Sequence, residues 1–296
     1  RNTALQLLGD KPEAADTKVL IKALGKASPD VQESILNYLA QSGSESQLAA
    51  IQKGYKAIKS TPAKIAALTT LSKLSKGSNS ASLISEIATA DEATVDAIEV
   101  LLLSAKDAQV VDNINNAVGT ADAKTKLVLL DILAQRSIAN SSKIILPLLS
   151  SADAPIRTAA LKALPTVVQN ADFEALVNVL PQTNAEDSKY VQQALVLVLN
   201  SSADKDAKVK KLAANISRSA APSAAKFFPI FAGVGGADAL QSVQGYLKNT
   251  DGTLRKDAIA SLANWSNPES LSTLISLSRE EKDPATFAVV FKGLIQ

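Results

Sequence analysis

The stretch Asp153-Ala-Pro-Ile-Arg-Thr-Ala-Ala-Leu-Lys-Ala-Leu164 decides the fold. It opens with an aspartate, whose carboxylate can accept hydrogen bonds from the free N–H groups of a first helical turn. A proline follows in that turn, where its missing N–H costs nothing. Apolar residues then recur at intervals of three and four. This stretch therefore predicts a capped helix with one apolar face.

The same pattern recurs along the chain. Nine copies start near residues 28, 60, 92, 122, 153, 187, 220, 251 and 283. Eight positions after the starts stand Leu36, Leu68, Val100, Leu130, Leu161, Leu195, Phe228, Ile259 and Phe291. Eleven positions after them stand Leu39, Leu71, Leu103, Leu133, Leu164, Val198, Phe231, Leu262 and Leu294. All of these residues are apolar, although hydrophobic residues make up only 46% of the chain. Each copy is therefore expected to be a helix with the same buried stripe.

Shorter apolar segments at helical spacing lie between the copies. They cover residues 19–24, 48–58, 83–88, 110–118, 144–149, 176–180, 209–216, 240–247 and 271–277. No segment shows the sustained alternation of a strand. One helix pair of this size cannot bury its own apolar face, but stacked pairs share a continuous core. The sequence therefore predicts an all-α, right-handed, armadillo-like α-solenoid of about nine helix pairs, forming a single array over residues 1–296.

Both ends of the chain suggest a piece of a longer protein. Residues 1–8 are predicted to be the tail of a second helix whose first helix is missing. The last helix, at residues 287–295, is apolar along its stripe, and solenoids need polar terminal repeats to stay soluble. We expect further sequence after Gln296 to cover Phe291 and Leu294.

Two copies carry a more specific motif, Asp153-Ala-Pro-Ile-Arg157 and Asp251-Gly-Thr-Leu-Arg255. This motif resembles the short bacterial HEAT-like repeat. The resemblance implies that each aspartate caps a second helix and that Arg157 and Arg255 join a ladder between repeats. Residues 233–296 are similar to HEAT modules of secreted bacterial proteins that accompany keto-disaccharide hydrolase-like domains. That similarity implies a periplasmic or extracellular location.

Composition excludes several classes of chemistry. The chain has no cysteine and no histidine, so Ser-His-Asp triads, Cys-His pairs and zinc sites of those ligands cannot form within it. The expected helix caps account for Asp122, Asp153, Asp187, Asp251 and Asp283. We expect no catalytic residue, no cofactor and no metal site. A cation site at Asp112, Asn113, Asn115 and Asn116 is an alternative to a plain polar helix end. Gly233-Val-Gly-Gly236 lacks the Lys-Ser/Thr of a phosphate loop and is interpreted as a helix-to-helix turn.

Net charge, aromatic content and the length of apolar runs argue against nucleic acid and membrane as partners. Lysine and arginine number 31 against 29 acidic residues, a net charge of +2, and only 4% of residues are aromatic. Nucleic-acid binding is therefore not expected. Taken by themselves, residues 1–76 have an excess of positive charge, with 11 basic and 6 acidic residues. We interpret this excess as a solvated face. No apolar run reaches the length of a membrane span.

The sequence therefore predicts a non-catalytic interaction or scaffold module. Its concave helical surface would bind a protein or glycan partner. Candidate binding residues are Trp265, Arg157 and Arg255. The alternative is an accessory region of a secreted carbohydrate-active enzyme, of the keto-disaccharide hydrolase-like type, whose catalytic domain lies outside this chain.

Overall fold

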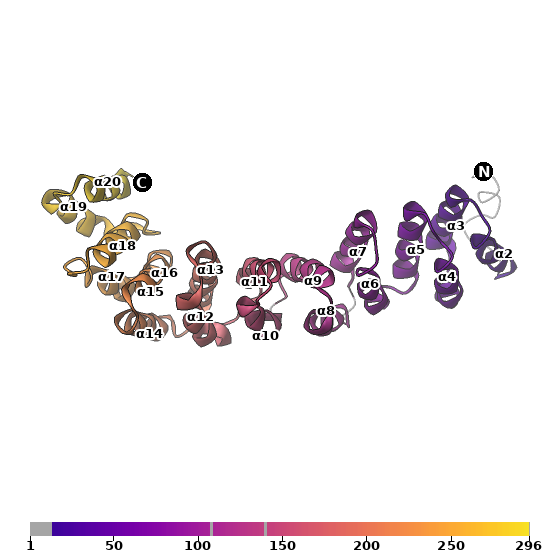
Figure 1. Cartoon of the computed structure of the whole chain (residues 1–296), viewed down its shortest axis with the longest axis horizontal. Coiled ribbons are helices and arrows are strands. Elements are labelled where there is room, and N and C mark those ends of the chain that lie inside the picture. Colours follow the sequence, from indigo (N-terminus) through magenta and orange to yellow (C-terminus); the bar gives the residue numbers. More distant parts are fainter. Residues whose placement is uncertain (1–13, 107–108, 139–140, 296) are drawn as a thin grey trace. The chain divides into compact units, whose positions relative to one another are not determined.

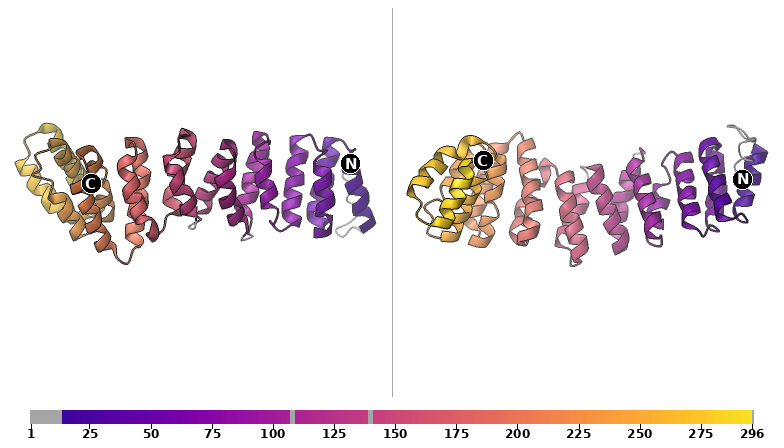
Figure 2. Two further views of the ribbon diagram at one scale, coloured as in Figure 1. Left: turned by 60° about the horizontal axis from the view of Figure 1, so that its bottom comes forward. Right: turned by 90° about the horizontal axis from the view of Figure 1, so that it is seen from above.

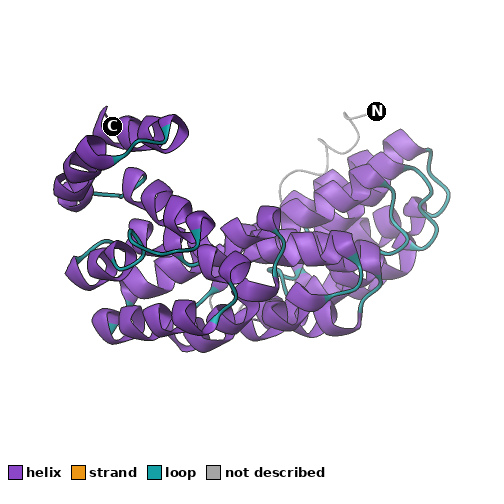
Figure 3. Cartoon of the chain, turned by 60° about the vertical axis from the view of Figure 1, so that its left-hand side comes forward, coloured by secondary structure: helices purple, strands orange, loops and turns teal. Residues whose placement is uncertain are grey.

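The computed structural model describes residues 14–106, 109–138 and 141–295. Within these ranges the chain is built of helices and contains no β-strand (Figures 1 and 3). The helices form nine pairs, which confirms the predicted α-solenoid fold. Backbone contacts divide the chain into two compact units, Arg1–Arg136 and Ser137–Gln296. The single array over residues 1–296 stays a prediction, and residues 1–8 lie outside the described residues.

The first unit contains four of the pairs. They are α2 (Ala14–Leu24) with α3 (Pro29–Ser42); η1 (Glu45–Gln47) and α4 (Leu48–Tyr55) with α5 (Thr61–Leu74); α6 (Ser80–Glu86) with α7 (Glu92–Ser104); and α8 (Gln109–Thr120) with α9 (Ala123–Arg136). The second helices α3, α5, α7 and α9 pack on one another in chain order. Figure 2 shows the helices of this unit standing side by side in a row.

The second unit contains the other five pairs. They are α10 (Ser142–Ile145) and η3 (Leu146–Ser150) with α11 (Ala154–Val167); η4 (Asn170–Asp172), α12 (Phe173–Val179) and η5 (Leu180–Gln182) with α13 (Ala185–Ser201); α14 (Lys205–Arg218) with α15 (Ala221–Ala225) and α16 (Phe228–Val234); α17 (Ala237–Gln244) with α18 (Gly252–Ala263); and η6 (Pro268–Ser270) and α19 (Leu271–Glu280) with α20 (Pro284–Ile295). The second helix of the third pair is interrupted before Pro229, and its two segments are α15 and α16.

Aspartates cap the second helices as the motif predicts. The Asp153 carboxylate accepts a hydrogen bond from the Ile156 backbone N–H at 3.1 Å. Asp251 accepts from the N–H groups of Thr253 and Leu254 at 2.9 and 3.2 Å. Each cap satisfies donors that the first helical turn leaves without a partner.

The predicted register is wrong in α7. The residue that caps this helix is Asp91, whose carboxylate accepts from the Thr94 N–H at 2.9 Å, one position before the predicted start. Ile98 and Leu102 consequently occupy the buried stripe, whereas Val100 is 63% exposed. The sequence pattern failed here because Asp91 and Glu92 are adjacent acidic residues, and only one of them caps the helix. Helix α13 also starts early, at the cap Asn184, yet Leu195 and Val198 remain buried.

Neighbouring second helices are joined by the same hydrogen bond in both units. The Thr70 hydroxyl of α5 donates to the Leu36 carbonyl of α3 at 2.9 Å. The Ser261 hydroxyl of α18 donates to the Phe228 carbonyl of α16 at 2.8 Å. In each case the residue ten positions after a repeat start meets the residue eight positions after the preceding start. Leu36 and Phe228 are fully buried at these contacts.

Cationic side chains donate to the carbonyl ends of helices, either in the preceding repeat or in their own helix pair. Arg136 donates to the carbonyls of Leu102, Leu103 and Ala105 at the end of α7, at 2.5, 3.1 and 3.0 Å. Lys205 donates to the Val234 carbonyl at the end of α16, at 2.8 Å. Positive charge is favourable there because the carbonyl end of a helix carries partial negative charge.

We expect Leu161→Asp to destabilise the second unit far more than Asp153→Ala does. Leu161 is buried between α11 and its neighbours, so an aspartate there places an unpaired charge in the core, at a cost on the order of 4 kcal/mol or more. Loss of the Asp153 cap should cost only about 1 kcal/mol. Thermal melts measure both effects. Melting curves for both variants that match the parent would contradict the stripe assignment.

The corrected register of α7 predicts opposite outcomes for two substitutions in one helix. Ile98→Asp should destabilise the first unit strongly because Ile98 is fully buried. Val100→Asp should change stability by less than about 0.5 kcal/mol because its side chain faces solvent. Urea unfolding gives the free energy of unfolding of the two variants. A larger loss of this free energy for Val100→Asp would support the register predicted from the sequence.

Candidate interaction groove

The first helices α4 and α6 lie apart in the first unit, and a groove runs between them over α5. Elsewhere in this unit, α2 packs on α4 and α6 packs on α8. The groove encloses about 670 Å³, within the range of ligand-binding clefts. Its lining comes from α4, α5, α6 and the adjoining turns: Leu48, Gln52, Tyr55, Lys56, Ile58, Lys59, Lys64, Leu68, Leu71, Ser75, Ser78, Asn79, Ser82, Leu83, Ser85 and Glu86.

The sequence of α6 explains the gap. Ser82 and Ser85 lie on the groove, and both serines are exposed. Side chains this short leave the space between α6 and α4 open. The floor is apolar and consists of Ile58, Leu68 and Leu83 with their neighbours. The groove therefore joins an apolar floor to polar walls.

A hydrogen bond bridges the two helices at one end of the groove. The Tyr55 hydroxyl, at the end of α4, donates to the Glu86 carboxylate, at the end of α6, at 2.6 Å. Partial burial raises the pKa of the Tyr55 phenol above its ordinary value of 10.0, and the nearby Glu86 carboxylate raises this pKa further. Tyr55 therefore stays protonated and keeps the bridge closed throughout the neutral range.

Three lysines gather at the bridged end. Lys56 and Lys59 lie in the turn after α4, and Lys64 lies in the first turns of α5. Among the ion pairs of the described residues, none involves these three ammonium groups. The opposite end offers hydroxyl and amide groups, including Ser78 and Asn79. The groove therefore carries three lysines and one carboxylate, that of Glu86, at one end, and it is neutral but polar at the other.

The sequence showed only part of this site. The excess of lysine in residues 1–76 is visible in the sequence, which predicts a solvated face there. The convergence of Lys56, Lys59 and Lys64 on one groove depends on the separation of α4 from α6. The exposed serines Ser82 and Ser85 of α6 are the sequence feature that lies at this separation.

The two candidate arginines form contacts within the second unit. Arg157 donates to the Ser151 carbonyl at 2.6 Å, inside its own helix pair. Arg255 donates to the Leu247 carbonyl at 2.9 Å and pairs with Glu281 of the next repeat at 2.8 Å. The repeat-to-repeat contact implied by the resemblance is therefore present at Arg255.

Trp265, the third candidate, lies at the end of α18 and is half-buried. Its indole N–H donates to the Glu269 carboxylate at 3.2 Å. The same carboxylate accepts from the Gly236 backbone N–H at 2.7 Å. Gly235 and Gly236 have φ of +64° and +95°, which side-chain-bearing residues rarely adopt, and they form the predicted turn between α16 and α17.

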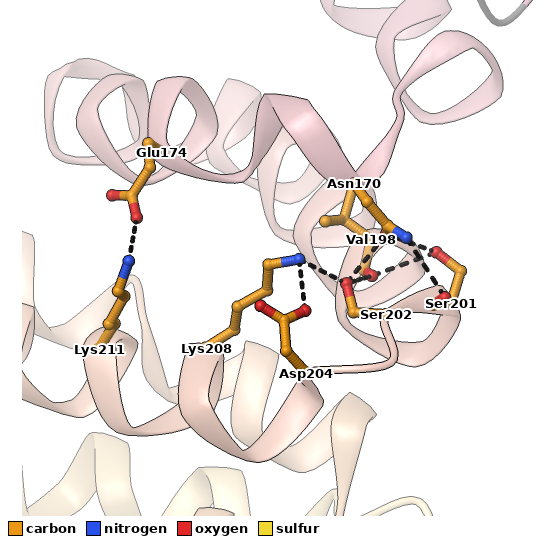
Figure 4. Close-up of polar contacts among 8 residues, drawn as sticks. All are labelled: Asn170, Glu174, Val198, Ser201, Ser202, Asp204, Lys208 and Lys211. Carbon is orange, nitrogen blue, oxygen red and sulfur yellow. Dashed lines mark hydrogen bonds and ion pairs between the residues drawn. The ribbon is translucent and has the colours of Figure 1, made fainter.

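A polar cluster on α12, α13 and α14 is satisfied internally (Figure 4). Lys208 contacts Asp204 at 2.9 Å and the Ser202 hydroxyl at 2.8 Å. Lys211 pairs with Glu174 of the preceding repeat at 2.8 Å. These contacts join neighbouring repeats, and each cation drawn already has an anionic partner. This cluster therefore contributes to packing between repeats.

The described residues contain no group of three or more His, Cys, Asp or Glu side chains that could hold a metal ion. At the proposed polar cluster, Asn113 instead donates to the Ser80 hydroxyl at 2.8 Å. In the ranges that the structure covers, no helix combines the length and apolar character needed to cross a bilayer.

Comparisons with known proteins find similarity to solved structures. No protein-family model and no curated protein matches the chain. An engineered protein of known structure is 16% identical, with 100% of this chain and 91% of that chain covered and a TM-score of 0.44. A second engineered protein is 16% identical, with 84% and 96% covered and a TM-score of 0.30. A structure concerning tubulin recruitment and assembly by microtubule polymerases with TOG domain arrays is 9% identical, with 100% and 97% covered and a TM-score of 0.34. At these TM-scores the likeness carries no argument about function.

We expect Tyr55→Phe to remove a late step from the alkaline titration of the folded chain. The raised pKa means that the Tyr55 contribution to stability is present below pH 10.0 and is lost as the pH rises through the folded-state value. Absorbance of the tyrosinate measures the titration. Tyr190→Phe is the control and should retain the late step. The bridge assignment would be wrong if Tyr55→Phe retained it.

Proposed function

We propose that this chain is a protein-interaction module and that the groove between α4 and α6 binds an acidic segment of a partner protein. The observation that carries the proposal is the groove itself, which places three lysines without ion-pair partners beside an apolar floor. Charged groups around an apolar contact are typical of surfaces that select one partner by charge.

A protein segment fits this groove better than the other ligand classes. Tyr55 is the one aromatic residue in the lining, so stacked bases have almost no platform. Backbone N–H and C=O groups of a bound segment can pair with Ser78, Asn79 and Gln52. Its acidic side chains would meet Lys56 and Lys59, and an aliphatic side chain would contact the floor. Each part of the groove then has a matching group in a peptide.

Charge reversal tests the proposal. The triple variant Lys56→Glu, Lys59→Glu and Lys64→Glu should weaken binding of a fluorescent peptide of alternating glutamate and leucine by about tenfold or more. The matched control reverses Lys53, Lys73 and Lys106, which are exposed in the same unit and lie outside the groove lining. Fluorescence anisotropy at several salt concentrations gives the affinities. Equal affinity of the two triple variants would contradict the proposal, as would equal binding of a serine–leucine peptide.

Within this proposal the chain works without catalysis. We expect the purified chain to hydrolyse no glycoside, ester, peptide or phosphate, with or without divalent metal, because histidine and cysteine are absent and acidic residues such as Asp153 and Asp251 cap helices. Chromogenic substrates of each class provide the measurement. Turnover that is lost on replacing one specific pair of acidic residues would overturn this expectation.

The concave binding face and the glycan partner stay predictions from the helical-repeat fold. The periplasmic or extracellular location and the link to keto-disaccharide hydrolase-like domains stay predictions that rest on the resemblance of residues 233–296. A binding role for Trp265, Arg157 and Arg255 also stays a prediction.

A further inference from the structure

The groove between α4 and α6 is bridged at one end. Figure 1 shows the two helices on either side of α5. Tyr55 and Glu86 are the last residues of α4 and α6, and the hydrogen bond between their side chains, at 2.6 Å, spans the gap between the helices. A polypeptide lying on the floor of the groove meets this bridge. It can end there, or it has to leave the floor to continue.

The bridged end carries more positive than negative charge. Lys56, Lys59 and Lys64 line it together with one carboxylate, that of Glu86. Asp91 lies close by, outside the lining. Hydrogen bonds from neighbouring threonines and, less strongly, the charge of Lys64 lower the pKa of the Asp91 carboxyl to about 2. Lys64 therefore already has an anion nearby, whereas Lys56 and Lys59 remain available to the anions of a ligand.

A chain terminus matches both features of this end. The last residue of a polypeptide has no following residue, so the bridge presents no obstacle to it. When that residue is acidic, it carries two carboxylates, one on the backbone and one on the side chain. Two ammonium groups can each donate to one of them in a charge-assisted hydrogen bond. An internal acidic residue has only one carboxylate, and its backbone has to continue past the bridge.

The length of the groove sets the length of the bound segment. Along α5 the lining runs from Lys64 at the bridged end to Ser75 at the other. At 1.5 Å per helical residue these two positions are about 16 Å apart. An extended chain, which rises about 3.3 Å per residue, covers this distance with about five residues. Leu68 and Leu71 lie between the two ends and are buried, so they can contact apolar side chains in the middle of the segment.

Resting on the function proposed above, we infer that the groove takes the carboxyl-terminal end of a partner protein, about five residues in extended form with an acidic last residue. The backbone and side-chain carboxylates of that residue pair with Lys56 and Lys59 beside the bridge. The segment leaves the groove past Ser78. Recognition of a free terminal carboxylate is an established mode of peptide binding in other proteins.

Two fluorescent peptides of equal charge test the inference. The first is Ser-Leu-Glu-Leu-Glu with a free carboxyl end, and the second is the same peptide extended by Gly-Ser-Gly-Ser. The extension adds no charge but moves the terminal carboxylate away from the acidic residue. The parent chain should bind the first peptide at least about tenfold more tightly, as measured by fluorescence anisotropy. Equal affinity for the two peptides would overturn the inference.

Three variants locate the source of this preference. The double variant Lys56→Gln and Lys59→Gln should reduce it to about twofold or less. The matched control, Lys53→Gln with Lys73→Gln, changes exposed lysines of α4 and α5 outside the lining and should retain it. Glu86→Ser removes the bridge, so the extended peptide should bind nearly as well as the first. An unchanged preference in Glu86→Ser would contradict the role given to the bridge.

A spin label tests the direction of the bound segment. Because the chain has no native cysteine, Ser78→Cys provides one attachment point at the end of the groove away from the lysines. The label should broaden the nuclear resonances of the amino-terminal peptide residues most, and strongest broadening at the carboxyl end would overturn the inference. Binding that depends on the lysines but not on a free terminus would leave the acidic-segment proposal intact and remove this one. Binding that is independent of the lysines would remove both.

Discussion

The burial of one large apolar side chain from each second helix against its neighbouring repeat is the contact on which the architecture depends. Leu36 and Phe228 show it most clearly, because a hydroxyl of the following repeat donates to each of their carbonyls. A single helix pair leaves that side chain in water, so each pair is stable only as part of a stack. The caps and the cation-to-carbonyl contacts then fix where each helix begins and ends.

Because the second helices hold the stack together, the first helices can differ in how closely they pack. The second helices α3, α5 and α7 pack in unbroken sequence, which holds the first unit together even where α4 and α6 lie apart. The floor of the resulting groove includes Leu68 and Leu71 of the buried stripe of α5, and the bridge from Tyr55 to Glu86 joins α4 to α6 at one end. At Phe291, the equivalent position in the last described repeat, the side chain is 52% exposed.

The fold could be predicted from the sequence because the apolar core residues recur at a fixed spacing, as those following Asp153 and Asp251 show. The predicted helix register was wrong where two adjacent residues could cap one helix, as at Asp91 and Glu92, because residue spacing alone cannot choose between them. The groove could not be predicted. It depends on how far α6 lies from α4, which short serine side chains decide through packing between helices that are distant in sequence.

Hydrogen exchange after one lesion in the second unit tests most directly whether stability passes from repeat to neighbouring repeat. Ile259→Asp places a charge in the fully buried core of α18. The account predicts faster amide exchange in α18 and in α16 and α20, which both pack on it. It predicts unchanged exchange in α3 and α5 of the first unit. Equal acceleration in every helix of the chain would show a single cooperative core and would contradict an architecture built on contacts between neighbouring repeats.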